Sequence, residues 1–300
     1  MNAIEIRNLS KSFRGMYAVD HLNMTVPQGA IYGFIGENGS GKSTTMKLIC
    51  GHLVRDGGEV TLFDREHTDP GVRVRVGALI ENAGCFPNSS VYQNLRMQTI
   101  NLGIENYDEE IRRVLEIVRM EDNADLKFKS CSLGMKQRIG IAMALLGDPA
   151  LLILDEPING LDTDGMRIMR EILLDITEKY GCTVLISSHI LGELEKIATH
   201  YGIIRGGKMV MELSAEEMDS RAQVFVSLKT GDMESALAAL SEKYGTVREE
   251  DGYIRVYDVA DPAEITAFLM ERGQAVCEIR KNKIGLEEYY IELMSKKEEE

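Results

Sequence analysis

The stretch GENGSGKST, residues 36–44, decides the fold because it is a phosphate-binding loop in its expected setting. It matches the pattern G-x-x-x-x-G-K-[ST] at Gly36, Gly41, Lys42 and Ser43. The apolar run IYGFI precedes it and a helical pattern over residues 44–50 follows it. Strand, glycine-rich loop and helix in this order point backbone N–H groups and a helix N-terminus at phosphate oxygens. The sequence therefore predicts a P-loop nucleotide site.

The loop supplies most of the candidate nucleotide ligands, which are Gly36, Asn38, Gly39, Ser40, Gly41, Lys42, Ser43 and Thr44. Lys42 is predicted to neutralise charge on the β- and γ-phosphates and to assist catalysis, and Ser43 to bind Mg²⁺. A glycine-rich turn without a ligand is the alternative interpretation. The strand before the loop and the helix after it argue against that alternative.

The run LLILDEP, residues 151–157, is the second piece of chemistry. Four apolar residues predict a buried strand that ends in two adjacent carboxylates. Asp155 is predicted to hold Mg²⁺ through its water shell. Glu156 is predicted to activate the water that attacks the γ-phosphate, as a catalytic base. A strand that merely ends at a polar turn is the alternative, and the P-loop upstream makes it less attractive.

The octapeptide CSLGMKQR, residues 131–138, lies between these two motifs. Ser132 is predicted to cap a helix, because apolar residues follow it at helical spacing. A helix N-terminus with a serine hydroxyl and a bare glycine backbone, here Gly134, is suited to an anion. A simple capped core helix is the alternative interpretation.

With GLD at 160–162 and SSH at 187–189, these motifs make the chain resemble the ATP-binding subunit of ABC transporters. The resemblance covers residues 3 to about 215 and implies ATP and Mg²⁺ as cofactors. It implies an α/β fold class: a P-loop ABC-ATPase core at 1–215, with a mixed or parallel sheet, an antiparallel β subdomain and a helical subdomain at about 82–147.

The resemblance also implies roles for residues outside the P-loop. Ser132 and Gly134 would contact the ATP bound to a partner subunit, so the working form would be an ATP-dependent homodimer. Asp162 belongs to the loop that crosses that interface. His189 matches the catalytic histidine at the γ-phosphate, although a lone histidine after a strand is more often structural. Phe13 matches the aromatic residue that stacks on adenine; the competing candidate is Tyr17.

Two departures from the family pattern narrow the resemblance. Leu133 replaces the first glycine of the usual signature, and Glu81 stands where the family has glutamine. This combination resembles the exporters of bacitracin and of lantibiotic immunity, in which a separate polytopic membrane permease carries the transport path. Glu81 is predicted to ligate Mg²⁺, because hard cations prefer anionic oxygen.

The loop after Glu81, AGCFPNSS, is a candidate contact for the membrane subunit. Phe86 is expected to be exposed there, as a socket for a helix of the membrane subunit. The alternative is that Glu81 is a solvated loop end and that Gln93 or Gln98 does the work of the family's glutamine.

Composition limits the function classes. A formal charge of −14 argues against a generic nucleic-acid partner, which would need a basic face. No apolar run is long enough to suggest a membrane span, so we expect a cytoplasmic protein that is peripheral to the membrane through its permease. Five cysteines far apart favour reduced thiols, with buried apolar roles, over disulfides.

Residues 223–300 carry fewer motifs and are predicted to form an α+β accessory domain. Strand and helix patterns in the order βαββαβ resemble a ferredoxin-like module, with Asp251-Gly252 at a hairpin turn. A last helix at 286–295 and a frayed charged end, KKEEE, complete the chain. A regulatory role and a stabilising one both fit this region.

The most consistent function is the ATPase subunit of an exporter of a peptide antibiotic or other drug-like cargo. The alternative is a soluble ABC-type ATPase acting on nucleic acid or the ribosome. A P-loop kinase or GTPase is disfavoured by the CSLGMKQR, GLD and SSH motifs. The sequence does not name the cargo, because a membrane partner would recognise it.

Overall fold

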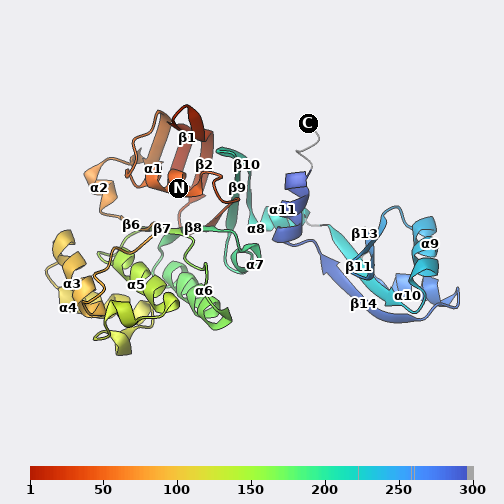
Figure 1. Ribbon diagram of the computed structural model, residues 1–300. Helices are drawn as coiled ribbons and strands as arrows, with labels where there is room; N and C mark the ends of the chain where they lie inside the picture. The colour runs from red at the N-terminus through yellow and green to blue at the C-terminus, as the bar shows by residue number, and fades with distance from the viewer. Residues whose placement is uncertain (222, 258, 260, 296–300) are drawn as a thin grey trace. The chain divides into compact units, whose positions relative to one another are not determined.

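The computed structural model describes residues 1–221, 223–257, 259 and 261–295 (Figure 1). The chain divides into two compact units, Met1–Ala215 and Glu216–Glu300, called here the N-terminal and C-terminal units. Each unit has its own hydrophobic core.

An antiparallel sheet begins the N-terminal unit, in the strand order β2-β1-β4-β5. Its strands are β1 (Asn2–Phe13), β2 (Met16–Pro27), β4 (Gly57–Leu62) and β5 (Arg65–Glu66). The turn between β1 and β2 places Arg14 and Gly15 at positive φ, as tight hairpins of right-handed twist require. This sheet corresponds to the predicted antiparallel β subdomain.

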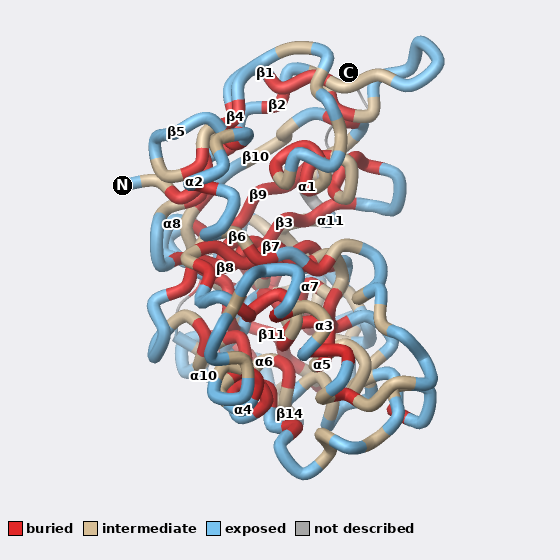
Figure 2. Tube along the Cα trace, turned by 90° about the vertical axis from the view of Figure 1, so that its left-hand side faces the viewer, coloured by how far each residue is buried: buried red, intermediate tan, exposed pale blue. Residues whose placement is uncertain are grey.

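The second sheet is mixed and has the strand order β10-β9-β3-β8-β7-β6. Its strands are β3 (Ile31–Ile35), β6 (Val76–Leu79), β7 (Leu151–Asp155), β8 (Thr183–Ser188), β9 (His200–Arg205) and β10 (Lys208–Ser214). All neighbouring pairs are parallel except β9 with β10. The apolar runs at 151–154 and 183–187 are therefore confirmed as buried parallel strands, which Figure 2 shows in red.

The helices of this unit are α1 (Lys42–Ile49), α2 (Pro70–Arg73), α3 (Val91–Leu102), α4 (Tyr107–Ile117), α5 (Leu133–Leu145), α6 (Thr163–Glu178) and α7 (Leu191–Leu194), with short 3₁₀ turns at Glu121–Asn123 and Phe128–Ser130. Helix α1 buries Met46, Leu48 and Ile49 in one core with residues of both sheets. Helices α3, α4 and α5 contact one another. They lie on the opposite side of the mixed sheet from α1 (Figure 1). The predicted helix over 109–120 is confirmed, with bounds shifted toward the N-terminus.

The C-terminal unit begins within helix α8 (Ala215–Arg221). Its elements are β11 (Val224–Thr230), α9 (Met233–Lys243), β12 (Val247–Glu250), β13 (Tyr253–Tyr257), α10 (Pro262–Met270), β14 (Val276–Lys283) and α11 (Leu286–Ser295). The order βαββαβ is confirmed, and the sheet is antiparallel in the order β12-β13-β11-β14. Asp251 and Gly252 have positive φ at the predicted hairpin turn. The charged end at 296–300 lies outside the described residues.

The composition led to expectations about the cysteines and about membrane spans. Cys131 and Cys182 are buried, but Cys277 is exposed, so the prediction of a buried role is wrong for Cys277. It lies on β14, an edge strand whose residues are mostly not buried. Within the described ranges, no helix is both long and apolar enough to cross a membrane.

Candidate active site

The candidate site lies where four neighbouring strands of the mixed sheet end. These strands are adjacent in the order β3, β8, β7, β6. Gly36 follows β3, Asp155 ends β7, and Glu81 comes two residues after β6. Asp155 is paired in register with Ser187 of β8. Carboxyl ends of parallel strands meet at one edge, so residues far apart in sequence converge there.

The P-loop needs glycine at two of its positions. A Cβ on Gly36 would lie 2.5 Å from the Ile204 carbonyl oxygen and from the Ser40 hydroxyl oxygen. A Cβ on Gly41 would lie 2.4 Å from the Ala18 carbonyl oxygen, and the φ of Gly41 is +110°. The loop therefore approaches other backbone segments too closely for any side chain at these positions.

Lys42 and Ser40 place polar atoms in the buried part of the loop. The Lys42 side chain is only 6% exposed, and its Nζ donates to the carbonyl oxygens of Gly36 at 2.6 Å and Glu37 at 3.1 Å. The Ser40 Oγ is buried and has no hydrogen-bond partner among the described residues. A buried ammonium and an unpaired hydroxyl are costly unless an anion or another acceptor joins them. This donor set fits a phosphate group.

Asp155 and Glu156 are joined through the Ser187 hydroxyl. Ser187 Oγ donates to Asp155 Oδ1 at 2.6 Å and accepts the Glu156 backbone N–H at 2.9 Å. Ser187 is fully buried, whereas Asp155 and Glu156 are partly exposed, so the hydroxyl anchors both from the protein interior. The hydroxyl thereby fixes the orientation of the Asp155 carboxylate and of the turn that follows it.

The Glu156 carboxylate lies between two cationic or basic side chains. His189 Nδ1 is 2.8 Å from Glu156 Oε2, and Lys42 Nζ is 3.8 Å from Glu156 Oε1. Glu156 has a φ of +51°, an uncommon conformation for a non-glycine residue that often marks a functional turn. The structure thus brings the three predicted catalytic residues Lys42, Glu156 and His189 together.

Ser43 and Asp155 are the residues suited to a Mg²⁺ ion. Ser43 is the second residue of α1, and Asp155 ends β7, a strand that α1 contacts. A hydroxyl and one carboxylate are typical protein ligands of Mg²⁺, which takes its other oxygens from water and phosphate. The residues present therefore fit a Mg²⁺ ion that binds together with a nucleotide.

The predicted signature residues form a second group. Ser132 caps α5, because its Oγ accepts the Met135 backbone N–H at 3.2 Å, as predicted. Asp162 caps α6 by accepting the Gly165 N–H at 2.8 Å. Ser132, Gly134 and Asp162 line one hollow of about 390 Å³. The N-terminus of α5, whose first turn has no acidic residue, is exposed there and can attract an anion, whereas the carboxylates of Asp162 and Asp164 offset the positive end of α6.

Leu133, which replaces the first glycine of the usual signature, also belongs to this group, because it lies close to Gly160. The sequence did not predict this contact. A Cβ on Gly160 would lie 3.0 Å from Leu133 Cδ2, and Gly160 has a φ of +75°. The leucine thus packs closely beside the glycine of the GLD motif, so a side chain there would have to displace the Leu133 methyl group as well as adopt a positive φ.

Phe13 and Tyr17 are both exposed, on either side of the β1–β2 turn. The Phe13 ring has Lys11 Nζ 5.5 Å from its centroid, and the Tyr17 ring is 6.5 Å from the His21 ring. Either ring is available for stacking, so the adenine contact stays a prediction for both.

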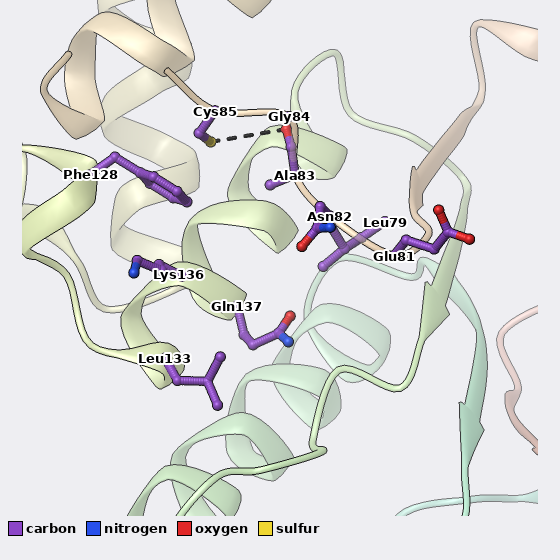
Figure 3. A pocket seen from close by; sticks show the side chains of 10 residues that line it. All are labelled: Leu79, Glu81, Asn82, Ala83, Gly84, Cys85, Phe128, Leu133, Lys136 and Gln137. Carbon is purple, nitrogen blue, oxygen red and sulfur yellow. Dashed lines mark hydrogen bonds between the residues drawn. The ribbon is translucent and has the colours of Figure 1, made fainter. Parts of the chain in front are cut away.

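Glu81 has a partner that sequence reasoning missed. Its Oε1 lies 2.5 Å from Lys47 Nζ on α1. Figure 3 shows the carboxylate directed away from Leu133 and Gln137, which line the same pocket. The carboxylate is thus paired with an ammonium in this structure, and the role of Glu81 at Mg²⁺ stays a prediction.

The two glutamines considered in place of Glu81 lie on α3. Gln93 is engaged in a capping box, in which its Oε1 accepts the Ser90 N–H at 2.9 Å. Gln98 lines a cavity of about 200 Å³ together with Asn82, close to the Glu81 loop. The geometry commits Gln93 to its own helix and leaves Gln98 beside the loop.

Three functional candidates were not predicted individually: Ser187, Lys47 and the Leu133–Gly160 contact. Ser187 belongs to the quoted SSH motif, but its role depends on the register of β7 and β8. Lys47 could have been flagged because it lies four residues after Ser43 and therefore on the same helix face.

Comparisons with known proteins agree with this architecture. A family model described as "ABC transporter" matches residues 19–159. The chain is 34% identical over 297 residues to the bacitracin transport ATP-binding protein BcrA of Bacillus licheniformis, with 97% of each chain covered. It is 37% identical over 222 residues to the lantibiotic transport ATP-binding protein SrtF of Streptococcus pyogenes, covering 74% of this chain and 95% of the relative.

A solved structure supports the fold. CbiO1 from Clostridium perfringens, described as part of the ABC transporter complex cbiONQ, aligns with a TM-score of 0.67 at 23% identity. The alignment covers 73% of this chain and 91% of that chain. The predicted fold class is confirmed, and nothing in these matches favours an ATPase acting on nucleic acid.

Proposed function

This chain belongs to the ATP-binding subunits of ABC transporters, and from that membership we propose that it uses Mg²⁺–ATP hydrolysis to power export through a separate polytopic membrane permease. The observation that carries the proposal is the Glu156 carboxylate, held at 2.8 Å from His189 and 3.8 Å from Lys42 at the end of β7. A general base beside a buried cation is the arrangement that phosphoryl transfer to water requires.

The proposed roles follow from the geometry. The P-loop N–H groups and Lys42 bind the β- and γ-phosphates, and Glu156 takes the proton of the attacking water. His189 holds the Glu156 carboxylate in place and contacts the γ-phosphate. Mg²⁺, when bound by Ser43 and Asp155, supplies charge neutralisation at the phosphate oxygens. Phe13 or Tyr17 stacks on adenine.

The second group of residues acts on another copy of the chain in this proposal. Ser132 and Gly134 present the N-terminus of α5 to the γ-phosphate of ATP bound by the partner, and the loop with Asp162 crosses between the copies. The exposed N-terminus of α5 supports this, because its first turn carries no acidic residue and such an end attracts anions. The working form is thus an ATP-dependent homodimer.

The permease contact is proposed at the loop after β6. Phe86 is 60% exposed there, so its ring is available to a partner. Beside it, Leu79, residues 81–85, Phe128 and the start of α5 line a pocket of about 270 Å³ (Figure 3). A helix of the permease inserted here would place the ATPase at the inner face of the membrane and would contact the Glu81 loop and α5 together.

The cargo class and the domain roles complete the proposal. Relatives that match this chain are named for transport of bacitracin and of a lantibiotic, so a peptide antibiotic is the proposed cargo. Residues 1–215 form the ATPase domain, with a helical subdomain at about 82–147. Residues 223–300 form an accessory domain that stabilises the chain, since its buried residues form a core of their own.

Affinity purification from detergent-solubilised membranes of the native host tests this function. A tagged chain should co-purify with a polytopic membrane protein, and the ATPase rate of the complex should respond to a peptide antibiotic. Phe86→Asp should reduce co-purification while MgATP binding is retained. Isolation of nucleic acid or ribosomes in place of a membrane protein would contradict the proposal.

A further inference from the structure

The Glu81 carboxylate is held by a residue outside the nucleotide motifs. Lys47 Nζ lies 2.5 Å from Glu81 Oε1, and the two side chains are 30% and 64% exposed. Glu81 has a φ of +67°, and the Asn82 N–H donates to the Ile80 carbonyl at 3.0 Å. The tight turn after β6 thus carries a side chain that reaches helix α1 without being buried.

The position of Lys47 on α1 gives this ion pair a relation to the metal site. Lys47 follows Ser43 by four residues, so both lie on one face of the helix, about 6 Å apart along its axis. Both are partly exposed, whereas Thr45 and Ile49 on the other face are buried. Long side chains on a helix lean toward its N-terminus, which directs the Lys47 ammonium toward the turn that contains Ser43.

We infer that Lys47 is a positioning residue that holds Glu81 one helical turn from the Mg²⁺ site, and that Mg²⁺–ATP and Lys47 compete for the same carboxylate. The inference rests on the proposed function, because it takes Mg²⁺ to bind at Ser43 and Asp155. It also explains why a glutamate is used: a carboxylate can exchange between an ammonium and a divalent cation, whereas a neutral amide binds each of them more weakly.

The ion pair is weak enough for the Glu81 carboxylate to exchange between Lys47 and Mg²⁺. An exposed lysine–carboxylate pair contributes little free energy and is weakened by salt, so its release opposes metal binding only modestly. The loop that carries Glu81 also leads to Phe86, the proposed contact with the permease. Transfer of Glu81 from Lys47 to Mg²⁺ would therefore move this loop when the nucleotide binds.

The test is a double-mutant cycle read by binding, without turnover. Purified wild type, Lys47→Met, Glu81→Gln and the double variant are titrated with Mg²⁺ at a fixed concentration of a fluorescent, non-hydrolysable ATP analogue. Lys47→Met keeps the aliphatic stem and removes the charge. It should lower the Mg²⁺ midpoint about three- to fivefold, as expected for an exposed pair. In the Glu81→Gln background the same change should leave the midpoint unshifted.

Lys47→Arg is the matched control, because it keeps the charge and should retain the wild-type midpoint. Equal shifts in both backgrounds would show that Lys47 acts directly on nucleotide charge and would overturn the inference, as would no shift in either. If the wild type bound the analogue without regard to Mg²⁺, both this inference and the proposed Mg²⁺ site would be wrong. A Mg²⁺-dependent wild type with no coupling between the two residues would overturn this inference alone.

Discussion

Two groups of polar residues in the N-terminal unit differ in what their side chains contact. In the first, Asp155, Ser187, Glu156 and His189 form a continuous chain of contacts that reaches Lys42. In the second, Ser132 and Asp162 accept hydrogen bonds from the first turns of their own helices. The first group is built around a buried hydroxyl and a buried ammonium, whereas the second is exposed.

The difference concerns preorganisation. Residues that hold one another in place can act on a bound phosphate without rearrangement, because their orientation is already fixed. Helix caps hold only the helix end, and their remaining N–H groups face outward. The first group is therefore organised within one chain, and the second is suited to complete a site on another chain. Substitutions in each group test this difference.

The largest effect is expected at Glu156. Glu156→Gln removes the proton acceptor but keeps the side-chain shape, so turnover should fall by about 10²–10⁴-fold while ATP binding is kept. Phosphate release measures turnover, and equilibrium dialysis measures binding. ATP should then hold a dimer together in size-exclusion chromatography. Wild-type hydrolysis by the variant would place the base elsewhere.

The contrast between the groups predicts complementation between two inactive chains. Lys42→Ala damages the first group, and Ser132→Arg damages the second. If the second group acts in trans, a mixed dimer has one composite site with both lesions and one intact site. Because half of randomly formed dimers are mixed, activity should recover to at most about a quarter of the wild-type rate. The measurement is ATPase rate against mixing ratio.

Binding by single chains provides the control for that experiment. Monomeric Ser132→Arg should bind ATP as the wild type does, because its own P-loop is intact. Loss of ATP binding by the isolated Ser132→Arg monomer would show that the second group acts on its own nucleotide and would remove the contrast.

Ser187→Ala should have an intermediate effect. The change removes the donor to Asp155 Oδ1 and leaves the buried Glu156 N–H without its acceptor. Partners that orient metal ligands typically contribute about 10–100-fold, so the Mg²⁺ midpoint should rise and kcat should fall within that range. Ser188→Ala is the matched control: Ser188 Oγ accepts the Ile190 N–H at 3.0 Å. An equal Mg²⁺ shift in both variants would contradict the role given to Ser187.

Local patterns predicted most of the fold and the first group. The P-loop, the strand that ends at Asp155 and the cap at Ser132 are each written within a few consecutive residues. The hairpin at Asp251-Gly252 is equally local, since its turn geometry depends on its own residues. Such elements are predictable because neighbouring residues alone decide them.

Contacts that depend on sheet order could not be predicted. The Ser187–Asp155 hydrogen bond requires the register of β7 with β8, and the Lys47–Glu81 pair requires α1 to lie near the end of β6. Cys277 was wrongly predicted to be buried, because the sequence does not reveal that β14 is an edge strand. Tertiary arrangement, rather than local propensity, decides each of these features.

The smallest effect is expected within the second group, at Gly160. Gly160→Ala places a Cβ at positive φ and 3.0 Å from Leu133 Cδ2, so it should lower the free energy of unfolding by about 1–3 kcal/mol. Gly181→Ala is the matched control, since Gly181 has a φ of +65° and no atom within 4 Å of its would-be Cβ. The excess cost at Gly160 therefore measures crowding by Leu133. Urea unfolding should show that excess in the wild type and lose it in a Leu133→Ala background. If Gly160→Ala still cost more than Gly181→Ala in that background, Leu133 would not hold the GLD loop. The caps of α5 and α6 would then be independent of each other.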